Sequence, residues 1–149
     1  MKKVYFKYGI LVAVLLIVYF FVLRALGLHT YTVLSSFNAV IYGLGIYYAL
    51  STYKKSHKKF KFEKGLEVGF MTGVIATVLF LIVMAIYMYQ IDTGFASTLL
   101  EGWETNYNNG PFVLLICILV MGFVTTFMLT FAFMQLLKIS WNTSKSEKE

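Results

Sequence analysis

The chain has 149 residues, of which 59% are hydrophobic and only 13% are charged. Soluble domains carry about 25% charged residues, so a soluble fold of this length could not cover its surface with polar side chains. The net charge is +6, and the single cysteine excludes a disulfide bond within the chain. We therefore expect residues 1–149 to form one all-α membrane domain.

Four apolar stretches are long enough to cross a bilayer as helices. The second has 23 residues, which as a helix is about 34 Å long, and the hydrocarbon core of a bilayer is about 30 Å thick. Strands of a membrane barrel are shorter, about 10 residues, and alternate in polarity, whereas these stretches are apolar on all sides. The predicted spans of this four-transmembrane-helix bundle are residues 8–28, 31–53, 68–90 and 112–137.

Basic side chains lie on one side of the predicted bundle. The amino terminus, the connection 54–64 and the tail 138–149 hold every lysine, and Arg24 lies on the opposite side. A lysine at the bilayer centre costs about 2.5–3.5 kcal/mol, and short basic loops therefore stay in the cytoplasm. We predict that both termini are cytoplasmic and that residues 91–111 form an outer loop.

The basic connection 54–64 has two interpretations. Near an anionic lipid surface each lysine contributes about 1 kcal/mol of attraction, so this connection could contact anionic lipid. The favoured interpretation is that it only sets the topology. Nucleic-acid binding is not expected from so short a membrane-tethered loop. The lysines concerned are Lys54, Lys55, Lys58, Lys59, Lys61 and Lys64.

The outer loop contains one helical apolar pattern. Apolar residues at i, i+3, i+4 and i+7 mark one face of a helix, and here they are Ala96, Leu99, Leu100 and Trp103. The pattern predicts a short helix lying in the membrane interface, with Trp103 as its anchor.

Small residues recur every four positions in three of the predicted spans. Lipid is as apolar as leucine, so helices in a bilayer associate through close packing at small residues. The stripes either pack the bundle internally or present one face to a partner or a second copy. The second span contributes Ser35, Ala39 and Gly43, the third Gly65, Gly69, Gly73 and Thr77, and the fourth Gly122, Thr126 and Thr130.

Residue types that carry chemistry within membranes are missing from the predicted spans. An ionisable residue at depth would mark a functional site, but the spans hold such residues only near their ends. Haem ligation needs histidines within the spans, and proton-coupled drug export needs a carboxylate there. Neither is found, nor is a phosphate-binding loop or a metal cluster. We therefore expect no catalytic, cofactor-binding or metal-binding residue, and no enzymatic activity.

The middle of the chain resembles a known family. The residues that carry the resemblance are Gly43 with Tyr47 and Tyr48, Phe62 and Gly69 around the lysine-rich connection, and Ile91-Asp92 with Phe95. Between Ile41 and Trp103 the chain resembles an uncharacterised family of small, four-span proteins of the bacterial inner membrane, known only as a domain of unknown function. The resemblance implies four helices and residence in that membrane. It supplies no activity and no functional residue.

Two functions remain open. The first is a non-catalytic accessory or structural subunit of a larger inner-membrane complex, favoured by the lack of buried charge and by several small-residue faces. The alternative is a small homo-oligomeric transporter or lipid-handling protein with a neutral polar path. That path would be lined by Asn38, Ser35, Ser36 and the threonines of the fourth span. It ranks second because it lacks the carboxylate that normally couples transport to protons.

Overall fold

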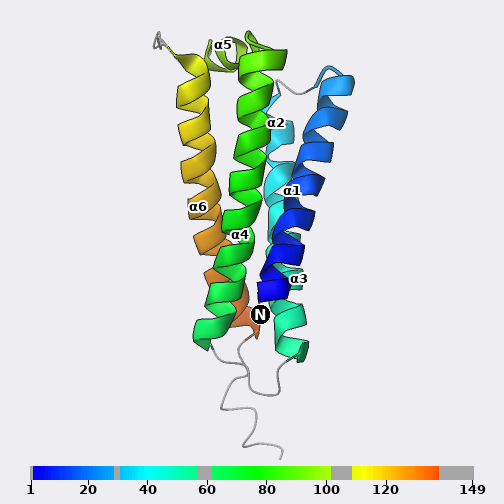
Figure 1. Ribbon diagram of the computed structural model, residues 1–149, viewed down its shortest axis with the longest axis vertical. Coiled ribbons are helices and arrows are strands. Elements are labelled where there is room, and N and C mark those ends of the chain that lie inside the picture. The colour runs from blue at the N-terminus through cyan, green and yellow to red at the C-terminus, as the bar shows by residue number, and fades with distance from the viewer. Residues whose placement is uncertain (1, 29–30, 57–61, 102–108, 138–149) are drawn as a thin grey trace, which may run out of the picture.

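The computed structural model describes residues 2–28, 31–56, 62–101 and 109–137. Within these ranges the regular structure is entirely helical, as expected. The helices are α1 (Lys2–Ala25), α2 (Thr32–Ser35), α3 (Phe37–Ser56), α4 (Phe62–Ile86), the π-helix η1 (Tyr87–Ile91), α5 (Phe95–Leu100) and α6 (Gly110–Leu137). The long helices α1, α3, α4 and α6 run side by side, and α5 lies across the end opposite the amino terminus (Figure 1).

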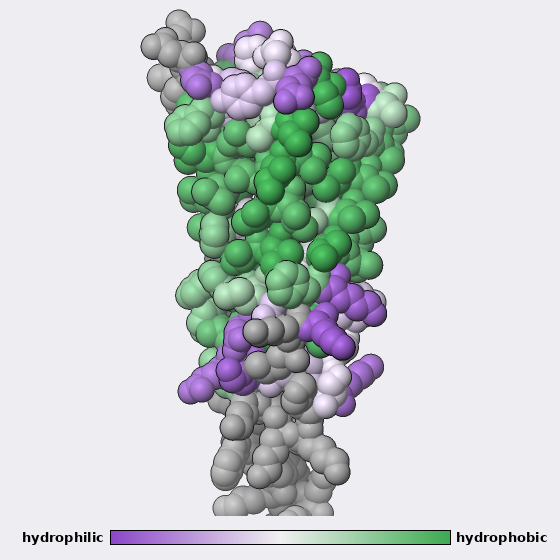
Figure 2. All heavy atoms as spheres, in the orientation of Figure 1, coloured by the Kyte–Doolittle hydropathy of each residue, from purple (hydrophilic) through white to green (hydrophobic). Residues whose placement is uncertain are grey.

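An apolar band covers the middle of the bundle on the face that Figure 2 shows. Within the described residues, three helical segments are long and apolar enough to cross a membrane: Lys3–Ala25, Phe62–Ile91 and Gly110–Leu137. Figure 2 shows hydrophobic residues around the middle of the visible face and hydrophilic residues at both ends. This arrangement indicates an integral membrane protein. Helix α3 packs against all three of these helices but is not itself one of the three.

The predicted second span, 31–53, is divided in the structure. Helix α2 ends at Ser35, and α3 begins at Phe37. Around Ser36 the backbone bonds span three residues, from Ser36 N to Val33 O and from Ala39 N to Ser36 O, each 3.1 Å long. Bonds of this kind belong to tighter 3₁₀-type turns, so the chain changes helical geometry at this point.

The other long helices extend beyond the predicted spans. Helix α1 begins at Lys2 and α4 at Phe62, because lysine and glutamate are good helix formers and a helix can continue past the hydrocarbon core. Helix α4 continues as η1, where Asp92 N bonds to Tyr87 O at 2.9 Å, five residues back. Such wide turns are rare and are often found at functional sites.

The core consists of two buried clusters. One lies among α1, α3, α4 and α6, and the other joins α1, α4, η1, α5 and α6 near the end of the bundle that holds α5. That end is named the outer end after the predicted outer loop, and the end that holds the start of α1 is named the inner end. Helix α1 approaches α3 closely at Gly45, where an added Cβ would overlap the Val12 side chain. It approaches α4 closely at Gly9, where an added Cβ would lie 2.8 Å from Ile75 Cβ. These glycines therefore set the separation of α1 from its two neighbours.

Glycines and threonines of α4 and α6 interlock at three successive levels. Gly69 faces Thr130, Gly73 faces Thr126, and Thr77 faces Gly122, so each level pairs one glycine with one threonine. A Cβ at Gly69 would lie 2.5 Å from Thr130 Cγ2, and one at Gly122 would lie 2.5 Å from Thr77 Cγ2. The glycine on one helix thus receives the threonine of the other, which lets the two backbones approach closely.

Helix α5 packs its apolar face onto the bundle. Phe95, Ala96 and Leu100 are buried, whereas Ser97 and Thr98 are exposed. The predicted short helix is therefore present as α5, and its apolar stripe packs on the bundle. Its position in the membrane interface stays a prediction. The predicted anchor itself, Trp103, lies outside the described residues.

Candidate functional site

The Tyr42 hydroxyl joins three helices in the centre of the bundle. Tyr42 is only 6% exposed, and its hydroxyl donates to Gly73 O at 2.5 Å. The hydroxyls of Thr77 and Thr126 lie 2.6 and 2.7 Å from the Tyr42 hydroxyl oxygen. Tyr42 belongs to α3, Gly73 and Thr77 to α4, and Thr126 to α6, so this polar contact ties α3 to the α4–α6 pair.

Three oxygens enclose this hydroxyl. A phenol hydroxyl has one proton to donate and two lone pairs to accept. The Gly73 carbonyl can only accept, so Tyr42 gives it its proton, and the Thr77 hydroxyl can donate to Tyr42. Thr126 donates its single proton to Gly122 O at 2.6 Å, so it lies against Tyr42 without donating to it. The Tyr42 hydroxyl therefore serves to join helices.

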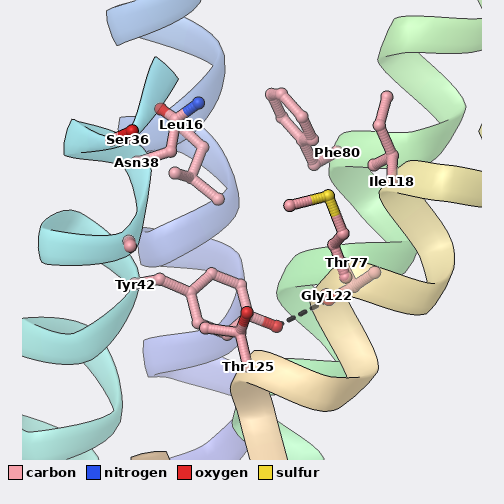
Figure 3. Close-up of a pocket in the computed structure, with 11 residues that line it drawn as sticks. Leu16, Ser36, Asn38, Tyr42, Thr77, Phe80, Ile118, Gly122 and Thr125 are labelled. Carbon is pink, nitrogen blue, oxygen red and sulfur yellow. Dashed lines mark hydrogen bonds between the residues drawn. The ribbon is translucent and has the colours of Figure 1, made fainter. Parts of the chain in front are cut away.

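A half-open cavity of about 370 Å³ begins at Tyr42 and extends toward the outer end of the bundle. Figure 3 shows α3 on one side of it and α6 on the other, with Tyr42 reaching across from α3. Helices α1 and α4 contribute the remaining walls through Leu16, Thr77 and Phe80. The other lining residues are Ser36, Asn38, Ala39, Ile118, Met121, Gly122 and Thr125.

The cavity exists because α3 and α6 touch only toward the inner end. There a Cβ at Gly43 would lie 3.7 Å from Leu129, and the rings of Tyr47 and Phe133 are 5.5 Å apart. Closer to the outer end Ala39 is exposed and Met121 is 68% exposed, so the gap between the helices opens to the side. We call this gap the α3–α6 groove.

The α3–α6 groove is neutral and contains an unpaired acceptor. Its polar side chains are hydroxyls and one amide, and none of these described lining residues carries a charge at pH 7. Asn38 Oδ1 is buried and has no hydrogen-bond partner among the described residues. A buried acceptor left in this state costs about 1–3 kcal/mol, so a donor that reaches this oxygen would be stabilised.

One other buried oxygen in the described part of the chain is unpaired, Thr130 Oγ1. It lies against Gly69 between α4 and α6. A helical threonine can rotate to bond the carbonyl four residues earlier, and Thr130 does not line the cavity, whereas Asn38 does. Asn38 is therefore the stronger indication of a ligand.

An aromatic cluster surrounds η1 at the outer end. The Tyr87 ring packs edge-on against Phe20 and Phe95, with centroids 5.0 and 5.3 Å away. The Arg24 guanidinium lies 4.9 Å from the centre of the Tyr87 ring, and the Tyr87 hydroxyl donates to Asp92 Oδ2 at 3.0 Å. Tyr87 therefore links Arg24 and Asp92, which the sequence placed on one side of the bundle, and both charges serve to fix this end.

The lysines at the inner end make contacts within the protein. Lys54 Nζ donates to Leu137 O at 3.0 Å, capping the end of α6, and Lys64 forms an ion pair with Glu67 at 2.9 Å. Lys55 is exposed. The described residues contain no group of three or more side chains that could hold a metal ion. Outside the description lie Lys58, Lys59 and Lys61 and the side chain of Ser35.

The predicted packing residues divide into two groups. Those of the third and fourth spans, Gly69, Gly73, Thr77, Gly122, Thr126 and Thr130, face one another across the α4–α6 contact. Those of the second span do not form one contact: Ser35 is in α2, Ala39 lines the groove, and Gly43 lies near Leu129. The tight contact of α3 is instead at Gly45, which packs against Val12. The sequence did not indicate which of the two glycines, Gly43 or Gly45, would lie at a tight contact.

Comparison with known proteins identifies a family. Residues 7–134 match the family described as "Protein of unknown function (DUF4199)". No match was found among curated proteins or solved structures. The matched region includes the residues between 41 and 103 that carried the resemblance and extends beyond them on both sides, so the resemblance to an uncharacterised family is confirmed. The chain belongs to the DUF4199 family of proteins of unknown function.

Proposed function

We propose that this protein is a non-catalytic membrane protein that binds a small, membrane-dissolved molecule in the α3–α6 groove. One observation carries the proposal: a cavity of about 370 Å³ between two helices is lined by Asn38, whose buried side-chain oxygen has no partner among the described residues. Small-molecule sites are typically cavities of about 300–1,000 Å³ with mostly apolar walls and a few placed polar groups. The α3–α6 groove has this size and this balance of groups.

The proposal includes a membrane arrangement. Helix α3 would also cross the membrane, giving four spans in all, because it lies alongside the three apolar helices for most of their length (Figure 1). The starts of α1 and α4 and the ends of α3 and α6 share one end of the bundle, and the lysines near them favour a cytoplasmic position for that end. We place the protein in the bacterial inner membrane with both termini inside, and the lysines of 54–64 near anionic lipid.

In this arrangement the groove opens to lipid rather than to water. Ile118, which lines it, is eight residues from the start of α6 at Gly110, or about 12 Å along the helix. The groove therefore lies below the membrane surface, where a lipid-soluble molecule can enter from the side. Its neutral walls favour binding and transfer of such a molecule over proton-coupled transport.

A subunit of a larger inner-membrane complex is the second candidate. It is favoured by α6, which the structure describes throughout and whose buried residues are Thr126, Thr130 and Met134. Met121, Phe127 and most of the remaining apolar side chains are at least partly exposed. Helices of a partner would cover this face through close packing.

Native mass spectrometry of the protein released from mild detergent tests the first candidate against the second. Ala39→Phe would fill the groove, while Val40→Phe places the same ring on a neighbouring, 56% exposed position outside it. We expect lipid-sized adducts on the wild type and on Val40→Phe, and their loss from Ala39→Phe. Equal adducts on all three proteins would contradict the proposal. A second membrane protein present in fixed ratio, unaffected by Ala39→Phe, would support the subunit candidate instead.

A further inference from the structure

We propose that the α3–α6 groove selects a neutral lipid alcohol, whose hydroxyl donates a hydrogen bond to Asn38 Oδ1. This inference rests on the proposed function and adds the chemical class of the ligand. It follows from three features of the groove: which polar groups have capacity left, what charge the walls can accept, and how deep the site lies.

Hydrogen-bonding capacity assigns recognition to Asn38. The Tyr42 hydroxyl is enclosed by Gly73 O and by the hydroxyls of Thr77 and Thr126, so its role is to hold the helices together. Asn38 Oδ1 is an acceptor without a partner among the described residues. This oxygen is closed off in the conformation described, and a half-turn of the amide about its Cβ–Cγ bond would exchange it with the amide nitrogen, which Figure 3 shows on the side of the cavity. An acceptor requires a donor, so a ligand that bonds this oxygen must carry an O–H or N–H group where it meets α3.

The walls of the groove exclude a charged headgroup. No residue among those that line it could neutralise a phosphate, a carboxylate or an ammonium group. Toward the outer end, Arg24 and Asp92 are both engaged with Tyr87. An ion buried without a counter-charge is strongly disfavoured. The ligand is therefore neutral.

The depth of the site favours a small headgroup over a phospholipid headgroup. Asn38 lies six residues beyond the start of α2 at Thr32, or about 9 Å along the helices, and the groove continues inward from there to Tyr42. A hydroxyl can lie below the interface when its one proton is bonded, whereas a phosphate cannot. An alcohol at Asn38 would direct its apolar chain along Leu16, Phe80 and Ile118, which line the same cavity.

Three single-chain probes of equal chain length separate these requirements. They are hexadecanol, its methyl ether, which has no donor, and hexadecyl phosphate, which is charged. Binding to the full-length protein in detergent is measured by displacement of a fluorescent hexadecanol analogue. We expect hexadecanol to bind about three- to tenfold more tightly than the ether, the range that one hydrogen bond within a membrane protein provides. We expect no displacement by the phosphate.

Matched variants show whether Asn38 is responsible for the preference. Asn38→Leu keeps the side-chain volume and removes the acceptor, so it should bind hexadecanol and the ether equally. Gln135→Leu removes an exposed amide of α6 outside the groove and should keep the wild-type preference. A preference for the alcohol that survives Asn38→Leu, or binding of the phosphate, would overturn the inference.

The design also separates failure of this inference from failure of the proposed function. If hexadecanol and the ether bind the wild type equally and Ala39→Phe abolishes both, the groove is a binding site but the alcohol preference is wrong. If Ala39→Phe leaves the binding of both probes unchanged, the groove is not the site and both proposals fail.

Discussion

At the scale of single residues, the Tyr42 hydroxyl fixes where α3 sits against α4 and α6. Its partners, Thr77 and Thr126, each lie four residues after a carbonyl on their own helix, Gly73 O and Gly122 O. Threonine hydroxyls in helices can bond that carbonyl. Loss of the phenol oxygen would therefore leave neither threonine without a partner, and its removal should be tolerated.

We predict that Tyr42→Phe lowers the free energy of unfolding by about 1 kcal/mol, near the value of one hydrogen bond between membrane helices. The measurement is unfolding by increasing SDS, followed by circular dichroism. Tyr48→Phe is the control, because Tyr48 is 56% exposed and should show almost no change. A loss above about 3 kcal/mol for Tyr42→Phe, or equal losses for both variants, would show that this account of the contact is wrong.

Only part of the site could be anticipated residue by residue. Asn38 and Ser36 were named for a neutral polar path, because amides and hydroxyls are costly within a membrane unless bonded. Tyr42 gave no such signal. A tyrosine in an apolar helix is equally suited to a core, an interface or a surface, and the chain has eleven. Its role depends on Gly73 and Thr126, which are distant in sequence.

At the scale of helices, the α4–α6 contact depends on three glycine–threonine levels. A Cβ at Gly73 would overlap the Thr126 side chain, whereas one at Gly43 would meet Leu129 at an ordinary 3.7 Å. Both glycines are in helices, so replacement by alanine brings both the same gain in helix propensity. The difference between the two variants therefore measures the packing cost alone.

We predict that Gly73→Ala is less stable than Gly43→Ala by about 1–3 kcal/mol, the usual cost of overpacking. Unfolding in SDS again provides the measurement. If the two alanine variants unfold at the same SDS fraction, then Gly73 is not at a tight helix contact and the pairing of α4 with α6 is different from that described.

The four-residue spacing of small residues indicates which helix faces allow close packing, but not which helix packs against each face. It marked Gly69, Gly73 and Thr126 because close packing in lipid requires small residues. That α4 and α6 pack against each other depends on the tertiary arrangement, which the spacing does not contain. The stripe of the outer loop was likewise periodic, but periodicity alone does not distinguish a face packed on protein from one packed on lipid.

At the scale of the whole molecule, charge and hydropathy determine the proposed orientation. The apolar band of Figure 2 has hydrophilic ends, and the lysines gather at the end that holds the starts of α1 and α4. Lysine-rich ends remain in the cytoplasm. Helix α3 is the least apolar of the long helices, because it carries an amide, several tyrosines and terminal lysines. It packs against the other three long helices, which cover part of its surface.

We predict four spans with both ends inside. Green fluorescent protein fused after Glu149 should fluoresce, because it folds in the cytoplasm, and alkaline phosphatase inserted beside Asn109 should be active, because it folds outside. The reciprocal fusions serve as controls and should be silent. Active phosphatase at the carboxyl terminus would contradict this arrangement, since it requires either an odd number of spans or the inverted orientation.

The central claim is that the α3–α6 groove holds a lipid molecule, and photolabelling tests it most directly. A sixteen-carbon alcohol with a diazirine in its chain would be crosslinked to the full-length protein in lipid nanodiscs, and the labelled residues identified by mass spectrometry. We predict labelling concentrated at groove residues such as Ile118 and Met121, and its loss in Ala39→Phe. Labelling spread evenly over exposed residues such as Val18 and Phe127, and unchanged in Ala39→Phe, would contradict the account.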